Sequence, residues 1–152
     1  VEGEGPVFRE VLLRRVREAW GLHRSGARVR AAFDAALSQS ERSKRVKVDR
    51  YGFVWPPKWN LTAVRVPTDD PDTKRSAHEF PHEELQLAVL RIVEDARGVS
   101  WDELTASVAR LLGWSRRGTE IAEVLDGAVR YLIRYKKLHR NGDLLTLANG
   151  PE

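Results

Sequence analysis

The sequence contains neither cysteine nor methionine in its 152 residues. Without cysteine the chain has no disulfide, thiolate metal ligand or thiol nucleophile, which is compatible with a cytoplasmic protein. It also lacks a signal-peptide pattern and any hydrophobic run near the roughly 18 residues of a membrane-spanning helix. We therefore expect no membrane partner. Because methionine is absent and the chain starts at Val1, we expect a piece of a longer protein.

Motifs of the common catalytic sites are missing as well. The sequence has no G-x-x-x-x-G-K-[ST] loop to hold ATP phosphates and no G-x-S-x-G elbow. Residues 78–82 do spell H-E-x-x-H, the zinc-protease motif. However, Pro81 lies between the two histidines and disfavours one continuous helix through them. We therefore predict no catalytic residue, no metal and no cofactor.

Acidic residues are scarce in the first part of the chain. Residues 1–66 carry 14 Lys and Arg against 7 Asp and Glu, whereas residues 67–152 carry 12 against 15. The overall composition, 41% hydrophobic and 32% charged, is typical of a globular protein. A basic surface for an anionic partner is therefore expected in the first part.

One pattern occurs twice, 92 positions apart, in residues 20–37 and 112–129. Five pairs of positions are identical, namely Gly21/Gly113, Arg24/Arg116, Gly26/Gly118, Asp34/Asp126 and Ala36/Ala128. Short helical patterns can coincide by chance, but a short apolar hairpin follows each copy and we favour a repeated module. Helix, glycine turn, helix and hairpin is the order of a winged helix. We predict a mainly α fold with short β-hairpins (α+β), built as two tandem winged-helix-like modules.

The first module is predicted in residues 1–66. Its apolar pattern indicates a helix over about 7–20, which Gly21 ends. Ser25 is the expected N-cap of the next helix, and alternation over residues 45–55 predicts a hairpin, the first wing. An apolar stripe on the second helix is expected in the core and comprises Val29, Ala32, Phe33, Ala36 and Leu37.

Residues 67–80 are rich in Asp, Pro, Thr, Ser and Lys, which predicts an exposed linker. The second module is predicted over residues 81–152 and begins with a helix at about 81–97. The first module shows no counterpart of that helix. Its opening element is therefore expected either upstream of the chain or from packing between the modules.

Local signals place the other elements of the second module. Ser100 is the expected cap of one helix, a long helix follows over about 119–137, and the Asn-Gly pair at 141–142 predicts a hairpin turn. The acidic pair at 83–84 is interpreted as charge that complements a helix dipole. We interpret Trp20, Trp101 and Trp114 as structural residues.

The candidate nucleic-acid-binding residues are basic and belong mainly to the first module. In a winged helix the second helix of the helix-turn-helix enters the major groove and the wing touches the backbone, so double-stranded DNA is favoured over single-stranded DNA as the partner. Cations there neutralise phosphates largely independently of sequence. The alternative is a solvated basic surface. The candidates are Arg24, Arg28, Arg30, Arg42, Lys44, Arg45, Lys47 and Arg50, with Arg116 and Arg117 in the second module.

Two other surfaces are weaker candidates. In the second module Glu120 and Glu123 follow the two arginines and repel phosphate, so this module is expected to pack against protein, although a secondary basic strip occupies residues 130–140. The segment WPPKW at 55–59 is similar to a stacking platform for unpaired bases. Packing in the core or between modules is the favoured interpretation of these tryptophans.

Several segments together resemble a known family. They are VEGEGPV at 1–7, LRRV at 13–16, GLHRSGARV at 21–29, LGWSRRG at 112–118 and NGD at 141–143. They are similar to a domain of unknown function near the C-terminal end of large bacterial proteins that resemble superfamily-one helicases. The resemblance implies an accessory segment of a nucleic-acid-remodelling protein and carries over no catalytic residue.

The expected function is that of a non-catalytic accessory domain of a larger helicase-like protein, which contacts DNA through the basic helix and wing of the first module. The alternative is a protein–protein docking module that binds other domains of the parent protein. The two differ in what they require of the surface. DNA binding depends on the basic residues, whereas docking predicts an exposed apolar patch.

Overall fold

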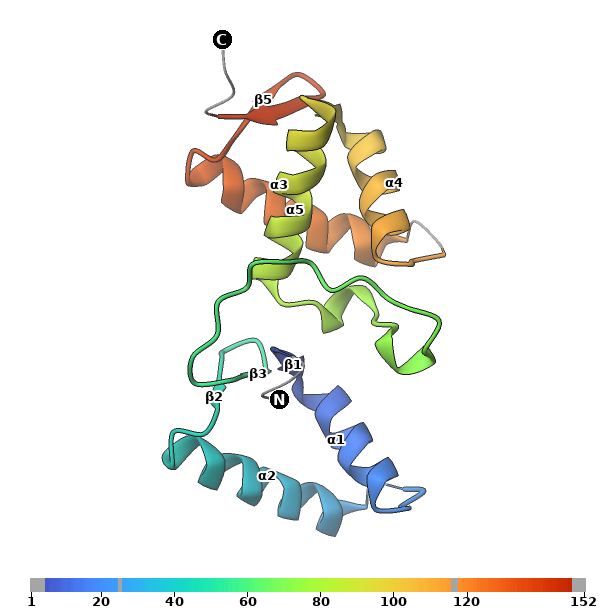
Figure 1. Ribbon diagram of the computed structural model, residues 1–152, viewed down its shortest axis with the longest axis vertical. Helices are drawn as coiled ribbons and strands as arrows, with labels where there is room; N and C mark the ends of the chain where they lie inside the picture. The colour runs from blue at the N-terminus through green and yellow to red at the C-terminus, as the bar shows by residue number, and fades with distance from the viewer. Residues whose placement is uncertain (1–4, 25, 116–117, 149–152) are drawn as a thin grey trace. The chain divides into compact units, whose positions relative to one another are not determined.

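The computed structural model describes residues 5–24, 26–115 and 118–148. These residues form five α-helices and two three-stranded antiparallel sheets, which confirms the predicted α+β class (Figure 1). The chain divides into two compact units between Asn60 and Leu61. Among the described residues, no helix combines the length and the apolarity that crossing a membrane requires.

The second unit has the element order of a complete winged helix. Its α3, α4 and α5 contact one another, and α3 also contacts β6, so that the helices and the sheet enclose one apolar core. The sheet order is β4-β6-β5. The elements are α3 (His82–Ala96), β4 (Val99–Ser100), α4 (Trp101–Leu111), α5 (Thr119–Arg134), β5 (Leu138–Asn141) and β6 (Leu144–Leu147).

Local sequence signals account for the element ends of this unit. Ser100 caps α4 as predicted, because its Oγ accepts from the Glu103 N–H while the Ser100 N–H donates to Glu103 Oε2. Gly142 lies in the hairpin turn with φ 60°, as the Asn-Gly pair predicted. Helix α5 ends at Arg134 rather than near residue 137, because Lys136 adopts a left-handed φ of 54° and the chain turns there into β5.

The first unit repeats the element order of the second unit from β4 onward. Among its described residues, no helix precedes the first strand. Its sheet order, β1-β3-β2, is the same. The helix predicted from residue 7 begins at Arg9, because Val7 and Phe8 pair with Val54 and Phe53 as a strand. The elements are β1 (Val7–Phe8), α1 (Arg9–Ala19), α2 (Ala27–Arg42), β2 (Lys47–Val48) and β3 (Phe53–Trp55).

The repeat extends to the backbone geometry. Both ends of α1 and of α2 recur 92 positions later as the ends of α4 and α5. Left-handed residues recur at the same offset, with Gly21 (φ 66°) matching Gly113 (φ 70°) and Lys44 (φ 56°) matching Lys136 (φ 54°). Position-by-position comparison of the two units is therefore possible.

The expectation that the apolar stripe of α2 lies in the core is wrong. No residue of α2 is buried, and Ala32 and Ala36 are exposed. The equivalent residues of α5 include Leu125, Ala128 and Val129, each at most 1% exposed. The difference arises because α3 packs against α5, whereas no described helix of the first unit takes the equivalent place.

The segment expected to be an exposed linker, residues 67–80, lies within the second unit. Ala77 and Phe80 are buried in its core. The Arg75 guanidinium lies 3.7 Å from the centre of the Phe80 ring, and the Trp114 indole N–H donates to the Arg75 carbonyl oxygen at 2.9 Å. These contacts bind a polar segment to the unit, a long-range effect that its composition does not show.

Glu84 is the centre of this attachment. Its carboxylate is fully buried and accepts hydrogen bonds from Arg65 Nη2 at 2.6 Å and Arg75 Nη1 at 2.9 Å. Burial alone raises the pKa of Glu84, but the hydrogen bonds and charges of Arg75 and Arg65 outweigh it and hold the pKa below its ordinary value. Glu84 thus does more than complement the helix dipole, whereas Glu83 is exposed as expected.

Candidate nucleic-acid interface

The predicted basic residues of the first unit gather at the two ends of α2. Arg24 lies in the turn before the helix and Arg28 in its first turn, and both side chains are exposed. At the other end, Arg42 is the last residue of α2, and Lys44, Arg45 and Lys47 lead into the wing. We call Arg42, Lys44, Arg45 and Lys47 the wing cluster.

Backbone geometry fixes the wing cluster in place. Lys44 takes the left-handed conformation that follows a helix end, and the Arg45 N–H donates to the Ser40 carbonyl oxygen at 2.9 Å. All four side chains are exposed, and among the described residues none of them forms an ion pair. Cations near a helix C-terminus also stabilise the helix itself. The cluster nevertheless leaves four charges open to an anionic partner.

Arg30 is placed differently from the other candidates. Its Nη1 donates to Glu10 Oε1 at 3.0 Å and to Oε2 at 3.2 Å. The neighbouring α1 thereby supplies a carboxylate that offsets the arginine charge. Arg9 and Asp34 form a second ion pair between the same two helices. Arg30 is therefore a poorer phosphate ligand than Arg28, since it must leave Glu10 first.

The wing is organised by a single carboxylate. Asp49 Oδ1 accepts from the backbone N–H groups of Tyr51 and Phe53, each at 2.9 Å, and Asp49 Oδ2 accepts from the Trp55 indole at 2.8 Å. At the tip, Arg50 donates to the Tyr51 hydroxyl at 2.6 Å and its guanidinium lies over the same ring. The tip therefore presents a cation together with an exposed aromatic ring.

Small residues occupy the outward face of α2. Ala31, Ala35 and Ser38 are exposed and lie between Arg28 and Arg42 on one side of the helix. The two arginines are 14 positions apart in the helix, or about 21 Å at ~1.5 Å per residue. This face allows a close approach of the backbone to a partner, and its hydrogen-bonding side chains between the arginines are Ser38 and Gln39, both exposed.

The second unit keeps cations at three of the four wing-cluster positions, namely Arg134, Lys136 and Lys137, and differs at the start of the helix. Arg116 and Arg117 lie outside the described residues. Glu120, at the position equivalent to Arg28, is exposed and its Oε1 lies 3.1 Å from His78 Nε2. Glu123 is exposed on the same helix, and Arg130 is paired with Asp126 at 2.8 Å. A carboxylate thus takes the place of Arg28 at the start of α5, whereas Arg134 keeps the charge of Arg42 at its end.

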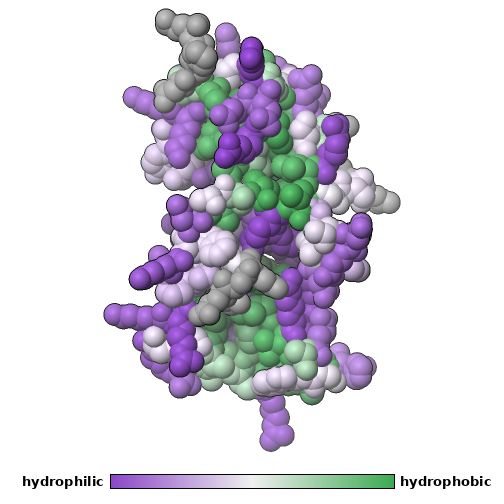
Figure 2. Space-filling view, in the orientation of Figure 1, coloured by the Kyte–Doolittle hydropathy of each residue, from purple (hydrophilic) through white to green (hydrophobic). Residues whose placement is uncertain are grey.

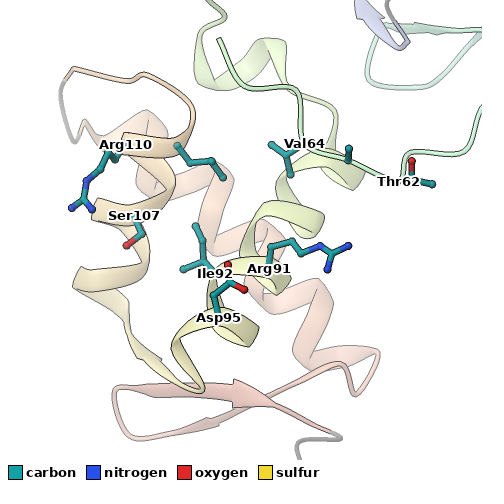
Figure 3. A pocket seen from close by; sticks show the side chains of 9 residues that line it. Thr62, Val64, Arg91, Ile92, Asp95, Ser107 and Arg110 are labelled. Carbon is teal, nitrogen blue, oxygen red and sulfur yellow. The ribbon is translucent and has the colours of Figure 1, made fainter. Parts of the chain in front are cut away.

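A shallow pocket of the second unit does not form a converging site. It has a volume of about 510 Å³ and lies between α3, α4 and the segment at residues 62–64 (Figure 3). Its charged residues are Arg91, Asp95 and Arg110. In Figure 3 the two guanidinium groups point to opposite sides, so they do not meet at one anion.

The H-E-x-x-H segment is split between two elements. His78 belongs to a 3₁₀ turn, η2 (Ala77–Glu79), and His82 begins α3, with the extended residue Phe80 between them. Glu79 is engaged in capping η2, since its Oε2 accepts from the Ser76 N–H at 2.8 Å. In the described ranges, no group of three or more His, Cys, Asp or Glu side chains is placed to hold a metal ion.

The tryptophans have unequal environments. Trp114 packs edge-on against Phe80, and Trp101 is partly buried against the core of the second unit, as expected of structural residues. Trp59 lies against Gly5, where a Cβ would meet its ring at 2.5 Å. Trp20 departs from the expectation, because it is 71% exposed.

Comparison with known proteins gives one finding. A family model described as a protein of unknown function (DUF3320) matches residues 1–31, which span β1, α1 and the start of α2. The match covers less than half of the chain and lies wholly in the first unit. No curated protein matches the chain. No solved structure matches it either.

Proposed function

We propose that this chain is a non-catalytic nucleic-acid-binding accessory domain of a larger, helicase-like protein. The first unit contacts double-stranded DNA, with α2 in the major groove and the wing along the backbone. The observation that supports this most is the wing cluster, which places four exposed cations without ion pairs, among the described residues, at the junction of helix and wing. Arg24 and Arg28 extend the contact at the other end of α2.

The same surface explains why little base preference is expected. Base readout needs side chains that donate to or accept from base edges, and between its terminal arginines the outward face of α2 offers two of them, Ser38 and Gln39, beside Ala31 and Ala35. Phosphate contacts position a protein without reading sequence. The site is therefore suited to binding duplexes of many sequences.

Protein docking is the second candidate function, and one observation favours it. The apolar residues of α1 and α2 form an open groove, which is the exposed apolar patch that a docking module requires. The residues that line the groove do not include the wing cluster, so the two functions are compatible.

The test is fluorescence anisotropy of labelled double-stranded and single-stranded oligonucleotides across salt concentrations. Six phosphate contacts by the open cations predict that duplex affinity falls on the order of 10³-fold between 50 and 200 mM salt. Single strands are expected to bind more weakly. Absence of duplex binding at 50 mM salt would contradict the proposal and leave protein docking as the remaining function.

A further inference from the structure

The first unit contains an apolar groove between α1 and α2, and the proposed DNA contact does not use this groove. Its volume is about 280 Å³. Figure 2 shows apolar surface in the first unit where Figure 1 draws the space between these two helices. Six residues define the α1–α2 groove here, namely Leu12, Val16, Trp20, Phe33, Ala36 and Leu37.

The second unit shows what covers such a groove. Its residues at the six equivalent positions, each 92 further along the chain, are at most 1% exposed, namely Leu104, Val108, Leu112, Leu125, Ala128 and Val129. They are covered by α3, which contacts both α4 and α5. The contrast is largest for Trp20, which is 71% exposed where Leu112 is 1% exposed.

We infer that the α1–α2 groove binds an amphipathic α-helix of another polypeptide segment, in the place that α3 takes in the second unit. The apolar face of α3 indicates the pattern required. Leu85, Ala88, Val89 and Val93 are buried and recur at intervals of three or four residues, which is one face of a helix. Helix-in-groove recognition uses anchors at this spacing.

One corner of the groove also indicates the charge of the occupant. In the second unit Glu120 at the start of α5 lies beside His78 of η2, just before α3. The first unit has Arg28 at the equivalent position. An occupant of this groove therefore meets a guanidinium near its N-terminal end, which favours acidic residues there. Such residues are also favoured by the dipole of the bound helix.

The experiment uses a labelled synthetic peptide of residues 81–97, with blocked ends, and the full 152-residue chain. This peptide has the apolar spacing described above and two glutamates in its first turn. We expect saturable binding by anisotropy, and protection of α1 and α2 amides from hydrogen exchange. A peptide with Leu85→Asp and Val89→Asp is expected not to bind, because both anchors are lost.

Two neighbouring alanines of α2 provide a matched pair of variants. Ala36 lines the groove whereas Ala35 does not, and both are exposed, so Ala36→Glu and Ala35→Glu are both compatible with the fold. Ala36→Glu is expected to weaken peptide binding at least about tenfold, since it places a charge in an apolar groove. Ala35→Glu is expected to leave peptide binding unchanged.

The Ala35→Glu and Ala36→Glu variants also distinguish peptide binding in the groove from the proposed DNA binding. Ala35 is on the outward face of α2, so Ala35→Glu is expected to weaken DNA binding more than Ala36→Glu does. The inference is wrong if the peptide does not bind saturably. It is also wrong if the Ala36→Glu variant and the wild type bind the peptide with equal affinity. It is also overturned by light scattering that shows a dimer which Ala36→Glu converts to a monomer, because the occupant is then a second copy.

Discussion

Reversing the charges of the wing cluster is expected to lower the affinity for duplex DNA by at least about 100-fold at 50 mM salt. The variant carries Arg42→Glu, Lys44→Glu, Arg45→Glu and Lys47→Glu. Each cation that neutralises a phosphate contributes about 0.9 to the slope of log K against log salt, so the slope is expected to fall by about 3.6. Fluorescence anisotropy over a salt series measures both quantities.

A reversal of equal size in the second unit is the matched control. Arg130, Arg134, Lys137 and Arg140 are exposed and belong to the secondary basic strip. Changing these four residues to Glu alters the net charge equally and is expected to reduce DNA affinity far less. If both reversals weaken binding equally, the interaction depends on overall charge, and the assignment of the site to the first unit is wrong.

Replacing Glu84 with Gln is expected to destabilise the second unit by about 3–5 kcal/mol, as is typical when one partner of a buried ion pair is removed. The change removes the charge that balances Arg65 and Arg75, and the Arg75 side chain is only 12% exposed. It also loosens the attachment of the segment that carries Arg75. Urea denaturation followed by the amide signals of α3 and α5 reports this unit alone.

Glu83→Gln is the control, because Glu83 is the exposed neighbour of Glu84, and its effect is expected to stay within about 0.5 kcal/mol.

The pH dependence of the unfolding free energy provides a second test of Glu84. The pKa of Glu84 is lowered in the folded chain, so its contribution is complete above its ordinary pKa of 4.5 and is lost as pH falls through the lower, folded value. The difference between wild type and Glu84→Gln should therefore shrink below pH 4.5. A constant difference would contradict the role of the ionised carboxylate.

Element types and several ends were predictable because their signals are local. Gly21 and Gly113 adopt positive φ at the ends of α1 and α4, and a glycine there is visible in the sequence. The cap at Ser100 is equally local. The strands β1 and β4 were not predictable, because each has only two residues and is defined by pairing with a strand far along the chain.

Long-range pairing also limited the prediction of the site and of the unit boundary. The basic candidates were selected by helix position, but the Glu10 contact that engages Arg30 depends on how α1 and α2 pack. The polar composition of residues 67–80 gave no sign that Arg75 binds a buried Glu84. The stripe at Val29, Phe33 and Leu37 was correctly identified as apolar. Whether it is buried depends on a covering helix, which its own pattern does not reveal.

Amide chemical-shift mapping during titration with a DNA duplex tests the central claim most directly. The account predicts shifts at Arg24, Arg28 and residues 42–50, together with the outward face of α2, and few shifts in α3, α4 and α5. Shifts concentrated on residues 130–140 of the second unit, or on the α1–α2 groove, would contradict the assignment of DNA binding to the basic helix and wing of the first unit.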